Sequence, residues 1–340
     1  MNQPFIFYNL VKRQLSMTLM SVIRNLSRSM SSSAIVRECK EIQIPVPWGH
    51  IAGKEWGHQD GEPWIALHGW LANCGSFDKL LPYFPKTQRI IAIDLPGHGL
   101  SSHFQPGVTY HYLDGLQYIR RVAIHFNLEK FNLIGHSMGG RISLMYSVTH
   151  PEHVNRLVML DAIKPISRSI DSIVQRTRAS VDDLLSIENK LNTGKSSHYT
   201  YEMALKRLLE GSHQLHGQES ITEESAKILL QRGLKKVSES DEDTWEFTRD
   251  LRHRATSLYG YPQEVMRHIS SEIKCPHLII KAKQGNLYEL SENVKEVLDI
   301  YKDSNPLFKK VDVEGNHHVH LNTPQNVWTH IEDFLGKTNL

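Results

Sequence analysis

The sequence predicts an α/β fold in which a mostly parallel sheet carries helices on both faces and an inserted helical cap interrupts the core. Two observations predict it. Apolar runs with strand character alternate with amphipathic helical segments in the first and last parts of the 340-residue chain. Between these parts, about a hundred residues carry helix signals without an evident core strand. Such alternation indicates parallel strands covered on both sides, and the interruption indicates an insertion.

The composition is that of an ordinary globular protein. Hydrophobic residues make up 40% of the chain and the formal net charge is +2, so no overall field attracts nucleic acid. The three cysteines, Cys39, Cys74 and Cys275, are odd in number and far apart. This spacing argues against a disulfide framework and against a cysteine-rich zinc site. We therefore expect reduced thiols in an intracellular protein.

Residues 1–37 differ from the rest of the chain. They contain five basic residues and no acidic one, which is typical of a mitochondrial transit peptide; the alternative is a disordered basic extension. Their apolar run "LSMTLMSVI" is shorter than the about 20 residues that a membrane helix needs, so no integral membrane segment is expected. Two other compartments stay open. A start at Met30 would give a cytoplasmic form, and the C-terminal Thr338-Asn339-Leu340 shares only its leucine with a peroxisomal signal.

The first core part is predicted over residues 41–164. Apolar β-rich runs indicate its strands, and apolar residues at helical spacing indicate its helices. In chain order these are two strands within 41–57, a strand within 63–70, a strand within 89–99, a helix over 112–128, a strand within 131–140, a helix from 141 that Pro151 stops, and a strand over 154–161.

The helical cap is predicted over 165–270, and the last core part over 271–340. Helix signals in the cap lie at 181–191, 200–211 and 223–236. Strand, helix, strand and helix then return at 275–282, 292–301, 307–315 and 323–336. Because the same alternation resumes after the cap, the cap interrupts one domain and does not separate two.

A serine lies at a predicted turn from strand to helix. The run "GHSMGG" places Ser137 in the pattern Gly-x-Ser-x-Gly, between Gly135 and Gly139. A sharp turn at this point lifts the hydroxyl above the sheet, and the glycines remove side chains that would collide with neighbouring backbone. Ser137 is therefore the candidate nucleophile, and a tight structural turn is the alternative.

A serine nucleophile needs a base, and the intermediate of acyl transfer needs two backbone N–H donors. Near the C-terminus, "GNHHVHL" offers His317, His318 and His320 as bases. In this architecture one N–H donor is the residue after the nucleophile, Met138. The other comes from the loop after the first parallel strand, where "LHGW" presents the backbone of Trp70.

The pieces "LHGW", "DLPGHGLS", "GHSMGG" and "GNHHVHLNTP" follow the order and spacing of the α/β-hydrolase superfamily, which the chain resembles from residue 41 to about 336. Within it, the sequence is most similar to the serine hydrolase-like, kraken-type proteins. The resemblance implies that the base lies seven residues before the proline that opens the last helix. Counting back from Pro324 gives His317.

The acid that orients the histidine is the least regular part of the pattern. The resemblance implies an aspartate after the seventh strand, but Gln284, Gly285 and Asn286 stand there, and Glu289 is the nearest carboxylate downstream. Some members of the superfamily carry the acid at the end of the sixth strand, where "VMLDAI" places Asp161. Strand ends on this face converge near the histidine loop. We predict Asp161 as the acid; Glu289 stays open, as does a helix-capping role for Asp161.

The predicted function is that of a serine hydrolase acting through an acyl-enzyme on a small carboxylic ester or thioester. The alternatives are a carbon–carbon bond hydrolase or amidase using the same triad, and a non-catalytic binding protein of the same fold. The chemistry needs neither metal nor organic cofactor. The expected partner is a small molecule with an apolar acyl group, not nucleic acid, and the sequence does not indicate an oligomeric state.

The inserted helices are expected to lie over the pocket and to select the substrate. Their aromatic residues have two interpretations, as the lining of an apolar acyl pocket or as the core of the cap itself. These residues are Tyr199, Tyr201, Trp245, Phe247, Tyr259 and Tyr261.

Overall fold

The computed structural model describes residues 39–338 apart from four short gaps, at 194–196, 218–219, 239–242 and 257–259. The basic leader at 1–37 and Tyr259 lie outside the described residues, as do the last two positions of the chain. Within the described ranges, no helix combines the length and the apolar character that crossing a membrane requires.

Eight strands form one sheet in the described chain. They are β1 (Cys39–Val46), β2 (Gly49–Trp56), β3 (Glu62–Leu67), β4 (Gln88–Ile93), β5 (Phe131–His136), β6 (Val154–Leu160), β9 (His277–Ala282) and β10 (Phe308–Val313). Their spatial order is β1-β2-β4-β3-β5-β6-β9-β10. The β1–β2 and β2–β4 pairs are antiparallel, and every pair from β4 to β10 is parallel. The prediction of a mostly parallel sheet is confirmed.

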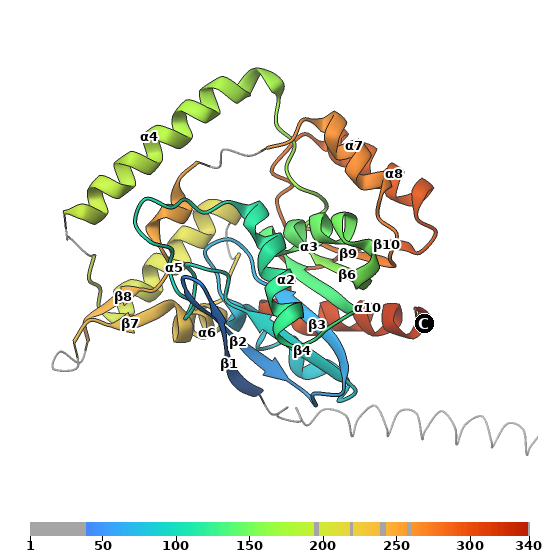
Figure 1. Cartoon of the computed structure of the whole chain (residues 1–340), viewed down its shortest axis with the longest axis horizontal. Helices are drawn as coiled ribbons and strands as arrows, with labels where there is room; N and C mark the ends of the chain where they lie inside the picture. The colour runs from blue at the N-terminus through green and yellow to red at the C-terminus, as the bar shows by residue number, and fades with distance from the viewer. Residues whose placement is uncertain (1–38, 194–196, 218–219, 239–242, 257–259, 339–340) are drawn as a thin grey trace, which may run out of the picture. The chain divides into compact units, whose positions relative to one another are not determined.

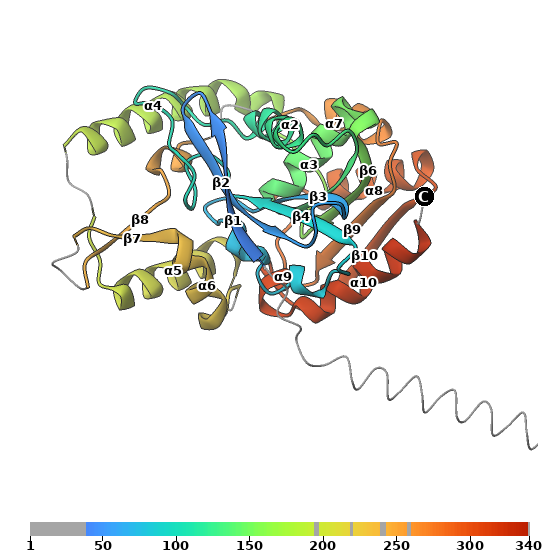
Figure 2. The ribbon, with the colours of Figure 1, turned by 60° about the horizontal axis from the view of Figure 1, so that its bottom comes forward.

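Helices cover both faces of this sheet (Figure 2). On one face, α2 (Gly115–His125), α3 (Met138–Thr149) and α8 (Ser291–Ser304) join the strands in one apolar cluster. On the other face, α10 (Pro324–Lys337) packs with the short helices η2 (Cys74–Phe77) and η3 (Leu81–Tyr83). Successive strand residues point to opposite faces. Both faces of the sheet are therefore buried, which explains why the strands read as continuous apolar runs.

The insertion between β6 and β9 contains four α-helices and two short strands in its described residues. They are α4 (Ile173–Asn192), α5 (Tyr201–His216), α6 (Glu223–Gly233), β7 (Leu234–Lys236), β8 (Trp245–Phe247) and α7 (Gln263–Ser271). The helix signal that runs to Lys236 ends earlier, at Gly233, because Leu234 has extended backbone and pairs with Phe247. Figure 1 shows α5, α6 and the β7–β8 pair together at one side of the sheet.

A buried ion pair joins the insertion to the core. Arg232, in α6, donates from Nε and Nη2 to Oδ2 of Asp94, at 3.0 and 2.8 Å. Asp94 follows β4 and is fully buried, and its other oxygen accepts the N–H of Cys74 at 2.8 Å. Asp94 is the aspartate of "DLPGHGLS", so this motif fixes one contact between the insertion and the sheet.

Replacing Arg232 by methionine should lower the free energy of unfolding by about 3–5 kcal/mol, because a buried carboxylate then loses its cationic partner. The measurement is the urea midpoint of the full chain. Lys227→Met is the matched control, since it removes an exposed ion pair with Glu223 from the same helix and should leave the midpoint unchanged. Equal midpoints for Arg232→Met and wild type would contradict this role of the pair.

Candidate active site

The predicted serine turn lies between β5 and α3. Ser137 has φ +51° and ψ −113°, a strained backbone conformation for a residue with a side chain, and it is the residue before α3 begins. The flanking glycines are required by space. A Cβ on Gly135 would lie 2.4 Å from the carbonyl carbon of Gly139, and one on Gly139 would lie 2.0 Å from the carbonyl oxygen of Leu67. The turn therefore positions Ser137 at the cost of local strain.

His317 and Asp161 are brought together from distant parts of the chain. Nδ1 of His317 donates to Oδ2 of Asp161 at 2.6 Å, and both side chains are buried. Asp161 directly follows β6, has φ +47°, and donates its backbone N–H to the Ile280 carbonyl at 2.8 Å. Nε2 of His317 has no hydrogen-bond partner among the described residues. The carboxylate therefore fixes the orientation of the imidazole through Nδ1, and Nε2 is available to accept a proton.

Asp161 is compensated by more than the histidine. Its Oδ1 accepts from Nζ of Lys281 at 2.5 Å and from the backbone N–H of Ala282 at 3.0 Å. Burial raises the pKa of Asp161, but the hydrogen bonds and charges of His317 and Lys281 outweigh burial, so the pKa lies below its ordinary value. Asp161 is therefore ionised at neutral pH, as an acid that stabilises an imidazolium must be.

Gly285 lies where the superfamily usually carries its acid, and it is in close contact with the Asp161 carboxylate. A Cβ on Gly285 would lie 2.3 Å from Oδ2 of Asp161 and 2.5 Å from Nζ of Lys281. The Gly285 carbonyl also accepts from Lys281 Nζ at 2.7 Å. Any side chain at 285 would thus occupy the space that the Asp161 carboxylate and its lysine now fill.

The alternative acid, Glu289, has different partners. Its Oε2 accepts from the buried ammonium of Lys164 and from the backbone N–H of Ser167, the latter at 3.3 Å. No hydrogen bond joins Glu289 to His317 among the described residues. The geometry favours Asp161 over Glu289.

Of the three C-terminal histidines, only His317 is hydrogen-bonded to a carboxylate in the described chain. Nδ1 of His318 donates to the Ser220 carbonyl at 3.1 Å, and both ring nitrogens of the buried His320 lack a partner among the described residues. A fourth histidine, His136, donates from Nε2 to the His317 carbonyl at 2.8 Å. The sequence analysis did not single out His136, although it precedes the serine in "GHSMGG".

The two expected N–H donors lie at the same site. Met138 is the first residue of α3, and Trp70 follows the turn after β3. Neither backbone N–H donates a hydrogen bond within the described part of the chain. The Trp70 side chain is 38% exposed, and its Nε1–H donates to the His253 carbonyl at 2.9 Å. This bond fixes the Trp70 loop to the insertion.

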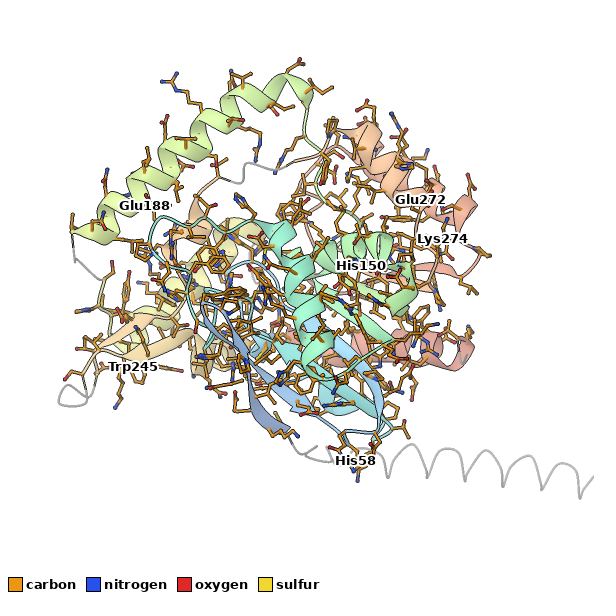
Figure 3. The ribbon with its side chains drawn as sticks, in the orientation of Figure 1. His58, His150, Glu188, Trp245, Glu272 and Lys274 are labelled. Carbon is orange, nitrogen blue, oxygen red and sulfur yellow. The ribbon has the colours of Figure 1, made fainter. Side chains whose placement is uncertain are left out.

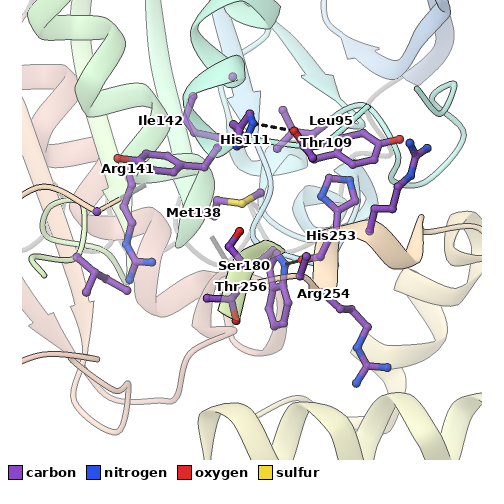
Figure 4. A pocket seen from close by; sticks show the side chains of 18 of the residues that line it. Leu95, Thr109, His111, Met138, Arg141, Ile142, Ser180, His253, Arg254 and Thr256 are labelled. Atoms are coloured by element: carbon purple, nitrogen blue, oxygen red, sulfur yellow. Dashed lines mark hydrogen bonds between the residues drawn. The ribbon is translucent and has the colours of Figure 1, made fainter. Parts of the chain in front are cut away.

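Ser137 lines a cavity of about 570 Å³. Its walls come from the core and from the insertion; Figure 4 shows Arg141 of α3 on one wall and His253 and Arg254 of the insertion on another. His216, at the end of α5, also lines it and stacks on His317 with ring centroids 4.1 Å apart. The Tyr288 hydroxyl is hydrogen-bonded to Nδ1 of His216. His317 therefore lies next to a residue of the insertion.

The described aromatic residues of the insertion do not line this cavity. Tyr199, Trp245 and Phe247 pack with one another and with the helices of the insertion, and Tyr261 packs against the main core. Figure 3 shows Trp245 on β8 at the outer end of the insertion. Of the two interpretations of these residues, the structure supports a packing role. The lining of the cavity also includes polar and basic residues such as Arg141 and His216, which the sequence did not indicate.

No group of three or more histidine, cysteine, aspartate or glutamate side chains in the described residues is arranged to hold a metal ion.

Comparisons with known proteins identify the fold family of the chain. Residues 63–322 match the sequence profile described as alpha/beta hydrolase fold. The chain is 34% identical to a serine hydrolase-like protein of Danio rerio over 91% of this chain and 92% of that protein. It is 35% identical to a probable serine hydrolase of Drosophila melanogaster over 87% of each chain. The solved structure of a hypothetical protein from Pseudomonas aeruginosa PAO1 superposes with a TM-score of 0.77, at 29% identity over 87% of this chain and 99% of that one.

Proposed function

The chain belongs to the α/β-hydrolase fold family, and we propose that it is a serine hydrolase that cleaves small ester-type substrates through an acyl-enzyme. The observations that carry the proposal are the 2.6 Å hydrogen bond between His317 and Asp161 and the serine that is held in a strained turn and lines a cavity. Membership of the family supports hydrolase activity. The residues support the serine chemistry.

The proposed reaction begins with attack of the Ser137 oxygen on the carbonyl carbon of the substrate. Nε2 of His317 takes the hydroxyl proton, and Asp161 stabilises the imidazolium. The backbone N–H groups of Met138 and Trp70 stabilise the negative oxygen of the tetrahedral intermediate. His317 then returns the proton to the leaving alcohol or thiol, which departs and leaves an acyl group on Ser137.

Water completes the cycle. His317 takes a proton from water, the resulting hydroxyl attacks the acyl carbonyl, and the proton returns to the Ser137 oxygen as the acid product leaves. In this proposal the insertion acts as a cap, because the base and the cavity are in contact with its residues, such as His216 and His253.

Ester hydrolysis by the full chain tests the proposal. A panel of 4-nitrophenyl esters of increasing acyl length should be hydrolysed with saturation kinetics. The matching 4-nitroanilides and a vinylogous diketone test the amidase and carbon–carbon alternatives. Saturable hydrolysis of the diketone alone would replace the ester assignment, and folded protein that hydrolyses none of these compounds would favour the non-catalytic binding protein.

Gly285→Ala should lower kcat/KM for the best ester by about a hundredfold, because displacing a catalytic group by about 1 Å has an effect of this size. The added Cβ displaces the carboxylate that orients His317. Gly211→Ala is the matched control, since a Cβ there meets no atom within 4 Å. Unchanged kinetics in a folded Gly285→Ala protein would mean that turnover does not depend on the present position of the Asp161 carboxylate.

A further inference from the structure

The charge of the cavity next to Ser137 is unusual for a site that binds only an apolar acyl group. No aspartate or glutamate is among its described lining residues. Five arginines line it instead, namely Arg141, Arg168, Arg176, Arg252 and Arg254. Arg252 is paired with Asp250 at 2.7 Å, Arg254 is largely exposed, and Arg176 has an interaction of its own. Arg141 and Arg168 are therefore the two arginines considered for the interior of the cavity.

Arg141 is a cation without an anion. It lies four residues after Ser137 in α3, and its backbone N–H donates to the Ser137 carbonyl at 3.2 Å. Its Nε is buried without a hydrogen-bond partner, and no ion pair or hydrogen bond reaches its guanidinium from the described residues. The guanidinium lies over the Tyr288 ring, whose centroid is 5.7 Å away. Because unpaired buried charge is unfavourable, this guanidinium is suited to a bound anion.

The local electrostatics agree with that geometry. Burial lowers the pKa of Arg141, and the nearby charge of Arg168 lowers it further. Two nearby carboxylates, Asp161 and Glu289, raise the pKa of Arg141. Asp161 is already hydrogen-bonded to His317 and Lys281, and Glu289 is paired with Lys164. Neither carboxylate is therefore free to neutralise the positive charge of the cavity.

Arg168 is the second cation. It follows β6 at the start of the insertion, where its backbone N–H donates to the Tyr261 carbonyl at 2.9 Å. Its side chain fills the space beside Gly260, where a Cβ would lie 2.1 Å from its Cγ. Burial and the charge of Arg176 lower the pKa of Arg168. Arg168 therefore lines the same cavity as Arg141.

We propose that Arg141 and Arg168 bind a carboxylate at the end of the substrate's acyl chain, so that the preferred substrates are monoesters of small dicarboxylic acids. This inference rests on the proposed ester hydrolysis and names the substrate class for it. Guanidinium groups bind carboxylates through two parallel hydrogen bonds, which fixes orientation as well as charge. The neutral ester carbonyl then lies at Ser137 and the free carboxylate at the arginines.

The test compares two esters with the same six-carbon acyl chain, the 4-nitrophenyl monoester of adipic acid and 4-nitrophenyl hexanoate. Succinate and glutarate monoesters, with butyrate and valerate esters as their neutral partners, cover shorter chains. We expect kcat/KM of wild type to be about 10- to 100-fold higher for the best monoester than for its neutral partner, which is the range for charge-assisted hydrogen bonds. Equal rates for every pair would overturn the proposal.

Substitutions of the two arginines test whether they cause the preference for the monoester. Arg141→Met should abolish the preference for the monoester and leave hydrolysis of the neutral ester in place, and Arg168→Met should weaken the preference. Arg178→Met is the matched control, because Arg178 lies on exposed α4, outside this cavity, and loses the same charge. A preference that survives in Arg141→Met, or an equal loss for both esters, would place the carboxylate elsewhere.

Binding without turnover separates this inference from the proposed function. Adipate, glutarate and succinate are titrated calorimetrically into the Ser137→Ala protein and into the Ser137→Ala/Arg141→Met protein. Binding that the second substitution weakens about tenfold or more supports the carboxylate site even if no ester is hydrolysed. Hydrolysis of neutral esters without dicarboxylate binding would overturn the site and leave the serine hydrolase standing.

Discussion

Ser137→Ala should lower kcat/KM for the best ester by about a thousandfold or more, because removal of the nucleophile leaves only the oxyanion donors and substrate binding. The fold should be unaffected, since alanine is smaller and the strained backbone at 137 is set by the glycines around it. Initial rates with substrate well below KM give the ratio directly. Circular dichroism and the thermal midpoint check that the protein is folded.

Ser147→Ala is the control for this change. Ser147 lies on the same helix, is also buried, and donates to the Ser143 carbonyl at 2.8 Å. Its replacement should leave kcat/KM at the wild-type level. A Ser137→Ala protein that keeps the rate of Ser147→Ala would show that another group is the nucleophile.

Asp161→Asn should lower kcat by about ten-thousandfold, the effect found when the triad acid becomes an amide and the histidine is held in the wrong tautomer. Glu289→Gln provides the comparison, since it alters the Lys164 pair and leaves the His317 bond intact. We expect Glu289→Gln to retain most of the wild-type rate, because Glu289 has no hydrogen bond to His317 among the described residues. Loss of turnover in Glu289→Gln alone would make Glu289 the acid.

Asp161→Asn also leaves Lys281 without its carboxylate, so a stability effect has to be separated from a catalytic one. Measuring the thermal midpoint of both variants does this. If Asp161→Asn is unstable, the double variant Asp161→Asn with Lys281→Met removes the unpaired ammonium and should restore stability while turnover remains low. Recovery of turnover together with stability would show that Asp161 has only a structural role.

The sequence predicts the sheet and the α/β-hydrolase family well because both depend on local patterns. Runs such as "FNLIGH" and "LVML" are apolar throughout since their strands are buried on both faces, and the structure and the comparisons confirm this class. The ends of helices are less predictable from the sequence. Helix α6 ends where Leu234 pairs with Phe247, and the sequence between these two residues does not indicate that they pair.

At the site, the sequence predicts Ser137 from its turn, and it predicts Asp161 because the acid is missing near Gly285. It did not identify the groups that surround them. Lys281 and Arg141 lie in runs that look like an ordinary strand and helix, and their roles arise only when β6 and β9, or α3 and the insertion, come together. The aromatic residues of the insertion are more conspicuous in the sequence than Arg141, but Tyr199, Trp245 and Phe247 pack inside the insertion.

Reaction of the full chain with a fluorophosphonate probe, followed by mass spectrometry of its peptides, tests most directly whether Ser137 is an activated nucleophile. The geometry of Ser137, His317 and Asp161 predicts a single adduct, on Ser137, in wild type and in Glu289→Gln. Labelling should be absent from Ser137→Ala and strongly slowed in Asp161→Asn. Folded wild-type protein without an adduct, or with an adduct on another residue, would contradict the proposed serine hydrolase.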